Sequence, residues 1–131
     1  MYGLASSAQS FENGEFVIAR IKYDGGGDWY SDPSSIPNLL KFIGGHTLIK
    51  PIGKEARVRL KDDDLFSYPY LYITGHGNII FDDQEIKRLR LYLESGGFIH
   101  ADDNYGMDKS FRREIRRAFP YNEWVELSHS H

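Results

Sequence analysis

The chain has 131 residues, of which 40% are hydrophobic and 27% are charged, a composition typical of one globular domain. Its formal net charge of -3 lacks the basic excess of nucleic-acid-binding proteins, so we expect no nucleic-acid partner. Because the chain contains no cysteine, disulfides, thiolate metal sites and cysteine nucleophiles are excluded. No apolar run approaches the roughly 20 residues that cross a bilayer, so we expect a soluble protein without a membrane span.

The first 14 residues are small and polar, and we predict a flexible N-terminal segment there, followed by a single α/β domain over residues 15–131. Ser6, Ser7 and Ala8 have the small-x-small character of a signal-peptidase site. The segment is therefore either the remnant of an export signal, which would place the protein outside the cytoplasm or in the periplasm, or an ordinary disordered terminus.

Several segments have the patterns of β-strands. Residues 16–23 alternate, with one apolar face and a second face on which Arg20 and Lys22 are predicted to reach solvent rather than neutralise nearby acidic loops. Residues 56–60 predict a strand near a sheet edge, and the apolar run within 68–74 predicts a central one. Residues 98–101 are expected to form a short buried strand, and 124–127 a final strand.

Helical patterns separate these strands. A first helix is expected to start after Ser34 or Ser35 and to end at the glycine pair 44–45. Asp82 is expected to cap the strongest helix, which ends at Gly96, and a last helix fills 108–119 with a basic, solvated outer face. The three aspartates 62–64 more simply begin a short helix than bind a metal.

This alternation predicts an α/β fold with three layers, a mostly parallel sheet and helices on both faces. We expect the strands at 16–23, 70–74 and 98–101 to lie parallel and adjacent. In such sheets, ligands bind at the carboxyl ends of the strands, where successive loops converge.

Three loops would meet at that edge. The first holds a triple glycine between two carboxylates, followed by two aromatic residues, and either forms an anion-binding nest or is a flexible turn. The second presents a histidine between two glycines, and the third follows the strand at 98–101 with two carboxylates. The predicted ligand-binding residues are Asp24, Gly25, Gly26, Gly27, Asp28, Trp29, Tyr30, His76, Asn78, Asp102, Asp103, Asn104 and Tyr105.

One histidine and several carboxylates suit either a divalent cation or general acid–base chemistry. A Ser-His-Asp triad is poorly supported because the chain has no Gly-x-Ser-x-Gly motif. A plainer alternative is structural: Asp102 braces the loop that follows it, and His76 hydrogen-bonds to it.

Four segments carry a resemblance. YDGGGDWYSDPSS with NLLKFI, YITGHGN, LESGGFIHADDNYGMDKSFRREI and FPYNEWVEL together resemble the bacterial domain of unknown function family numbered 4159. That resemblance implies a scaffold similar to flavodoxin-like class I glutamine amidotransferases and trehalose-utilisation-type domains, with GGFIHADD near the position of their nucleophile. It also implies export, and a family pattern that continues past His131, so that an edge strand or part of the site would be missing.

Two functions remain open. The favoured one is a binding module for a polar ligand, such as a sugar or an anion. The alternative is a hydrolase with His76 or Asp102 as general base, with Asp103 alongside and with or without a divalent metal. No other cofactor is evident. Because the chain has no cysteine, we expect no glutaminase activity.

Overall fold

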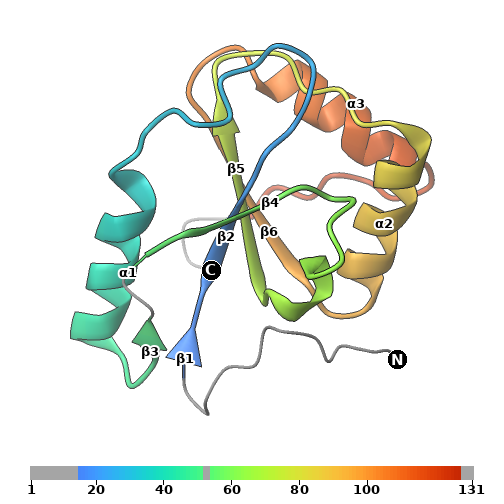
Figure 1. Cartoon of the computed structure of the whole chain (residues 1–131). Helices are drawn as coiled ribbons and strands as arrows, with labels where there is room; N and C mark the ends of the chain where they lie inside the picture. The colour runs from blue at the N-terminus through green and yellow to red at the C-terminus, as the bar shows by residue number, and fades with distance from the viewer. Residues whose placement is uncertain (1–14, 52–53, 128–131) are drawn as a thin grey trace.

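The computed structural model describes residues 15–51 and 54–127, and shows an α/β fold with a parallel four-stranded sheet (Figure 1). The strand order is β4-β2-β5-β6, and β1 and β3 form a separate two-stranded parallel pair. The predicted flexible segment and the export motif lie outside the described residues. In chain order, the elements are β1 (Glu15–Phe16), β2 (Ile18–Ile21), α1 (Ser35–His46), β3 (Lys50–Pro51), β4 (Ala56–Val58), the 3-10 helix η1 (Leu65–Ser67), β5 (Tyr70–Gly75), α2 (Asp83–Glu94), β6 (Phe98–Asp103) and α3 (Asp108–Ala118).

The three main strands are parallel and adjacent, as their apolar character and intervening helices predict. Ile18 of β2 pairs with Tyr70 of β5, and Tyr70 pairs in turn with Phe98 of β6. Strand β5 is central and almost wholly buried, whereas β4 lies at one edge. These predictions from the sequence are confirmed.

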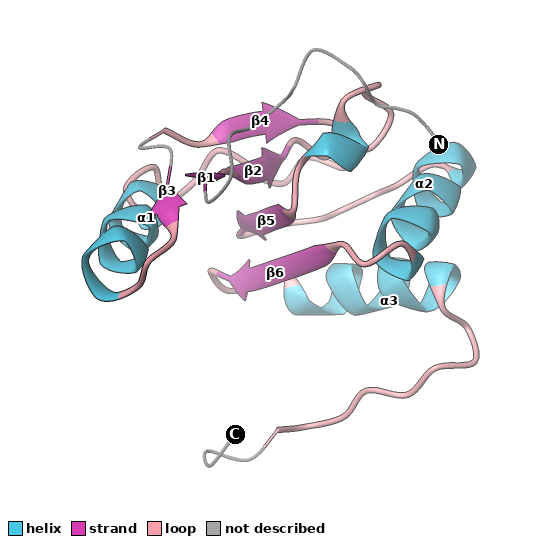
Figure 2. Ribbon diagram, turned by 90° about the horizontal axis from the view of Figure 1, so that it is seen from below, coloured by secondary structure: helices cyan, strands magenta, loops and turns pink. Residues whose placement is uncertain are grey.

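Helices lie on both sides of the sheet, with α1 on one side and α2 and α3 on the other (Figure 2). On the α1 side, Ile36 and Leu40 pack against Ile18 and Tyr72 in a small apolar cluster. The larger cluster lies under α2 and α3 and contains alternate residues of β2 and β5. No described helix is long and apolar enough to cross a membrane.

The helix boundaries follow local chemistry. Asp82 and Glu85 form a reciprocal capping box at the start of α2, as expected. The predicted end of α1 is wrong, because the helix continues through the glycine pair to His46. It stops at Thr47, whose backbone N–H and hydroxyl both donate to the carbonyl of Ile43, at 3.0 and 2.7 Å.

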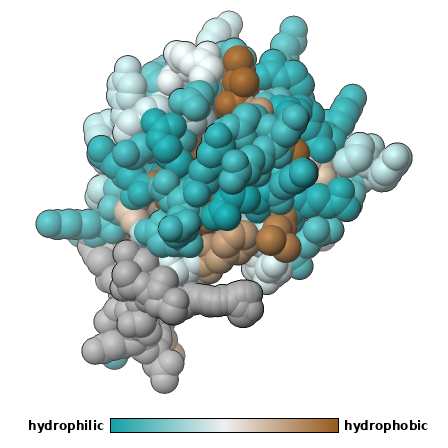
Figure 3. Space-filling model, turned by 45° about the vertical axis from the view of Figure 1, so that its right-hand side comes forward, coloured by the Kyte–Doolittle hydropathy of each residue, from teal (hydrophilic) through white to brown (hydrophobic). Residues whose placement is uncertain are grey.

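The side of the molecule that carries α2 and α3 is mainly hydrophilic (Figure 3). The basic residues on the outer face of α3 are exposed, which confirms the solvated interpretation. Arg113 and Arg117 also hold a loop: they donate to the carbonyls of Ile79 and Phe81, in the connection between β5 and α2.

Strand β6 differs from the short buried strand that was predicted. It extends to Asp103 and is the edge strand opposite β4 among the described residues, and the Phe98 side chain is 54% exposed. The apolar sequence is that of a covered strand, but this edge position leaves Phe98 in solvent. The extension also places Asp102 and Asp103 within the strand rather than after it.

The predicted final strand at 124–127 is wrong, because these residues have no strand conformation. Side-chain contacts with α3 hold this segment instead. The ring of Trp124 packs against Phe111, with centroids 6.2 Å apart, and the guanidinium of Arg112 lies 4.6 Å from the Trp124 ring centroid.

Candidate functional site

The three predicted loops follow β2, β5 and β6 at the same edge of the sheet, at the top of Figure 1. They are joined to one another by hydrogen bonds. Gly27 N–H donates to the carbonyl of Asn78 (3.2 Å), and Asn104 N–H donates to the carbonyl of Gly75 (3.2 Å). The topology therefore builds one continuous polar rim from segments far apart in the sequence.

At the centre of this rim, His76 contacts Asp28. The backbone N–H of His76 donates to Asp28 Oδ1 (2.5 Å), and Nδ1 of the ring lies 2.8 Å from Asp28 Oδ2. These hydrogen bonds, the backbone one first, lower the pKa of the Asp28 carboxyl below its ordinary value of 3.8. An ionised carboxylate only accepts hydrogen bonds, so Nδ1 carries the hydrogen and Nε2 is left for another partner.

The two side chains differ in exposure. That of His76 is 59% exposed, whereas that of Asp28 is 29% exposed. Asp28 therefore supports the ring from the protein side, and the imidazole is accessible to a molecule in solution.

Two glycines permit this close approach. Gly75 has φ +150°, and a Cβ there would lie 2.1 Å from the Tyr23 hydroxyl and 3.1 Å from Asp28 Oδ1. Gly106 has φ +92°, and its Cβ would lie 2.5 Å from the carbonyl oxygen of His76. Both positions thus need glycine for conformation and for space.

Tyr23 lies against Gly75, beside the Asp28–His76 pair. Its hydroxyl donates to the carbonyl of Thr74 (3.0 Å). Burial, with a smaller contribution from the negative charge of Asp28, raises the pKa of Tyr23 to about 12. The phenol thus stays protonated and acts here as a hydrogen-bond donor.

The glycine loop packs closely against the segment after β5. Ile80 N–H donates to the carbonyl of Asp24 (2.8 Å), and a Cβ on Gly25 would lie 2.8 Å from the Asn78 carbonyl oxygen and from Ile80 N. The Gly27 N–H is occupied by Asn78, so it is not available to an anion. This geometry favours the turn interpretation over a nest.

The flanking residues of this loop have other partners. Asp24 pairs with Arg59 at 3.3 Å on the surface. The ring of Trp29 has Lys22 Nζ and the Arg57 guanidinium within 5.6 and 5.5 Å of its centroid. Tyr30 packs edge-on against Trp29 and is 62% exposed, so it contributes an accessible aromatic ring to the rim.

Asp102 and Asp103 point to opposite faces of β6, as successive strand residues do. Asp102 Oδ2 accepts from the Tyr72 hydroxyl (2.9 Å). Asp103 Oδ1 accepts from the backbone N–H groups of Tyr105 (2.8 Å) and Met107 (2.9 Å). Among the described residues, neither aspartate forms a hydrogen bond or ion pair with His76. The residue that braces the following loop is Asp103 rather than Asp102.

The third loop reaches the first through Asn104, whose side-chain amide donates to Ser31 Oγ (3.1 Å). Tyr105, with φ +96° and a side chain 87% exposed, projects from the same loop. Exposed aromatic rings on the first and third loops therefore accompany His76 on the rim.

No three or more His, Asp or Glu side chains come together as a metal site in the part of the chain that the structure describes. His76 and Asp28 supply two donors. Any metal there would need its remaining ligands from water or from a bound molecule.

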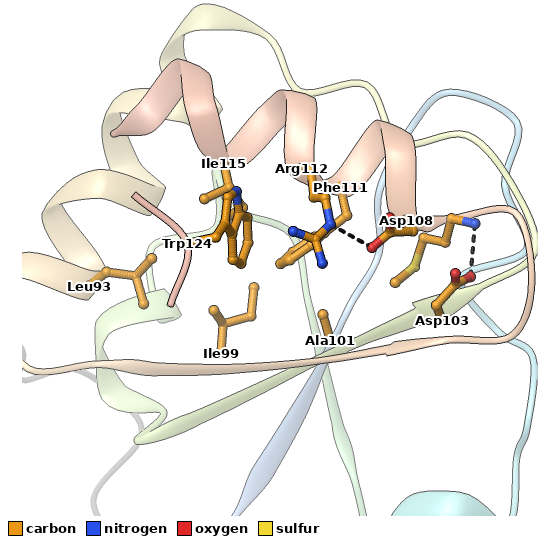
Figure 4. Close-up of a pocket in the computed structure, with 10 residues that line it drawn as sticks. Leu93, Ile99, Ala101, Asp103, Asp108, Phe111, Arg112, Ile115 and Trp124 are labelled. Carbon is orange, nitrogen blue, oxygen red and sulfur yellow. Dashed lines mark hydrogen bonds and ion pairs between the residues drawn. The ribbon is translucent and has the colours of Figure 1, made fainter. Parts of the chain in front are cut away.

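An apolar cavity of about 390 Å³ lies between β6, α3 and the segment after α3 (Figure 4). Asp103 stands at one end and Trp124 covers the other. The Asp103 carboxylate is already bonded to Met107 N–H there, as the figure shows. The apolar residues that line the cavity include Leu93, Ile99, Ala101, Phe111 and Ile115. Asp108 and Arg112 also line the cavity, and they are paired with each other at 2.8 Å.

Residues 17–131 match the family model described as a domain of unknown function (DUF4159). The chain belongs to this family. The match begins next to β2 and contains all three loops of the rim, so the Asp28–His76 pair lies inside the DUF4159 domain. Comparison with curated proteins gives no match.

One supporting residue, Arg20, cannot be recognised from the sequence pattern. Arg20 is 1% exposed, and its side chain pairs with Glu55 at 2.7 Å. The prediction of a solvated Arg20 is therefore wrong. Alternation along the strand indicated its face correctly, but Glu55 lies outside that strand, so no local pattern showed that a buried partner was present.

Proposed function

We propose that this DUF4159 domain binds a small polar ligand, a sugar or an anion, at the C-terminal edge of its sheet. The observation that carries this proposal is the exposed His76 ring, fixed through Nδ1 by Asp28. A neutral ring offers Nε2 as an acceptor for a hydroxyl, and a protonated ring offers a donor to an anion.

The surroundings of His76 support the same ligand class. Tyr30 and Tyr105 provide exposed aromatic faces on the rim, which suit the apolar faces of sugar rings. The amide of Asn104 is held in place by Ser31, and the His76 backbone N–H is held by Asp28 Oδ1.

A second candidate function, hydrolysis, draws on the same pair. A carboxylate that orients a histidine through Nδ1 leaves Nε2 able to act as a general base. In this version Asp28, rather than Asp102, is the orienting group, since Asp102 is bonded to Tyr72. This alternative includes a metal-assisted form, in which a divalent cation would bind near His76.

The scaffold assignment is part of the proposal. Parallel strands with helices on both sides support a three-layer, flavodoxin-like domain similar to class I glutamine amidotransferases. Without cysteine, such a scaffold lacks the nucleophile of the glutaminase reaction.

Binding is tested by NMR titration of the 131-residue chain with inorganic phosphate, glucose and Mg²⁺, each added separately. Calorimetry follows for any probe that shifts the NMR signals of His76. We expect the His76→Gln variant to bind a positive probe at least about 10-fold more weakly, the loss of one charge-assisted hydrogen bond. His46→Gln is the matched control, because His46 is an exposed histidine on α1 whose Nδ1 has an oxygen partner of a different kind, the backbone carbonyl of Phe42. Equal binding by parent and His76→Gln would refute the site.

Hydrolysis has a separate readout. Turnover of a nitrophenyl ester or glycoside that disappears in both His76→Gln and Asp28→Asn, but not in His46→Gln, would favour the enzyme over the binding module.

A further inference from the structure

Arg20 is a buried cation in the middle of β2 whose hydrogen bonds are complete. Its guanidinium uses Nε and one Nη2 hydrogen for the two oxygens of Glu55, at 2.7 and 3.2 Å. The other three N–H groups donate to the main-chain carbonyls of Trp29 (3.2 Å), Ser31 (2.6 Å) and Asp32 (3.1 Å). All five donors of the side chain are thus occupied.

Those three carbonyls belong to the loop that carries Asp28. A turn closes over the same residues, since Ser31 N–H donates to the Asp28 carbonyl (2.9 Å). Asp32 has φ +53°, a conformation that costs free energy in a residue other than glycine. Such a conformation persists where neighbouring bonds hold it, and Arg20 supplies one of those bonds.

Glu55 fixes the guanidinium in turn. Its carboxylate is only 12% exposed. Glu55 directly precedes β4, the strand that neighbours β2 in the sheet. The guanidinium also lies 5.4 Å from the centroid of the Tyr72 ring on β5. Arg20 is thereby held by elements of the sheet while its remaining donors hold the loop.

We propose that Arg20, oriented by Glu55, is the positioning residue that sets the 28–32 loop so that the Asp28 carboxylate lies on His76. Arg20 touches neither His76 nor a ligand, and acts through the carbonyls of the loop. The inference concerns the site of the proposed function, but it makes a claim about geometry that needs no ligand.

The test measures the titration of the Asp28 carboxyl by ¹³C NMR in the parent, Arg20→Lys and Arg88→Lys chains. Arg88 is a matched control because it also donates to main-chain carbonyls, those of Leu60 and Asp62, in a loop outside the site. We expect Arg20→Lys to raise the Asp28 pKa toward its ordinary value, because the two hydrogen bonds from His76 that lower it would be lost. Arg88→Lys is expected to lower stability without changing that titration.

A second readout and a second variant keep the inference falsifiable. The His76 amide proton, moved downfield by its bond to a carboxylate, should move upfield in Arg20→Lys only. Should Arg20→Lys not fold, Glu55→Gln replaces it, since a glutamine amide group facing Arg20 leaves one guanidinium donor without an acceptor. An unchanged Asp28 titration and His76 amide shift in the folded variant would overturn the proposal. A changed titration with no ligand found would leave the positioning role intact and count against the proposed binding function alone.

Discussion

Gly106 offers the sharpest test of whether the third loop contacts His76, because the chain contains a control with the same backbone angle. Gly106 and Gly26 both have φ +92°. A Cβ on Gly106 would lie 2.5 Å from the His76 carbonyl oxygen, whereas a Cβ on Gly26 would have nothing within 4 Å. The substitutions Gly106→Ala and Gly26→Ala therefore place alanine at the same φ and differ in steric contact.

The expected magnitudes follow from this difference. Placing alanine at such a positive φ costs about 1–2 kcal/mol of unfolding free energy in either variant. In Gly106→Ala the His76 carbonyl must also retreat by about half an ångström to reach 3.0 Å, the shortest separation that real Cβ atoms show. Such overpacking costs a further amount of about 1–3 kcal/mol. The His76 backbone has little freedom to move, since its N–H is bonded to Asp28.

Urea unfolding followed by tryptophan fluorescence measures both variants, with Gly96→Ala as a second open control at φ +98°. We expect Gly106→Ala to be the least stable of the three by about 1–3 kcal/mol. Equal destabilisation of all three variants would refute the close approach of the third loop to His76.

Three further predictions concern the same edge. Because the pKa of Asp28 is lower in the folded chain, its contribution to stability is present above pH 3.8 and is lost as the pH falls through the folded value. The stability difference between parent and Asp28→Asn, measured by unfolding across pH, should therefore shrink in acid. Asp24→Asn, which removes only an exposed surface pair with Arg59, is the control and should cost little stability at neutral pH. Asp102→Asn should cost about 1 kcal/mol or less in thermal or urea unfolding, since the asparagine oxygen can still accept from Tyr72, and a cost of several kcal/mol would contradict the surface position of Asp102. The pure protein should release no ammonia from glutamine above a heat-treated control, and measurable release would show that another nucleophile replaces cysteine.

The arrangement of the sheet could be predicted because it depends on periodicity and connection length. Apolar runs at 70–74 and 98–101, separated by an amphipathic helix, are sufficient to indicate adjacent parallel strands. Strand ends were harder to predict, since hydrogen bonding to a neighbour extends a strand past its last apolar residue. Register pairs Thr74 with Asp102 and Gly75 with Asp103, so two carboxylates expected in a loop belong to β6.

The burial of the charged residue Arg20 also could not be predicted from the local sequence pattern. The alternation of residues 16–23 showed that Arg20 and Lys22 share a face, and a charged residue is ordinarily solvated there. Arg20 is buried because three carbonyls from the loop after its own strand and a carboxylate before β4 converge on it. That convergence exists only in the folded chain.

The same register explains why His76 is paired with Asp28 and not with the aspartates of β6. Gly75 is level with Asp103, so the residue level with His76 is Asn104, whose N–H bonds back to Gly75. The first loop, by contrast, folds across the end of β5 and brings Asp28 to the histidine from the other neighbouring strand. Parallel topology thus determines which loops share the edge, whereas register and loop length determine which side chains touch. Mutational study of the imidazole should therefore begin with Asp28 and with Arg20, the positioning residue proposed above, rather than with Asp102, which is bonded to Tyr72.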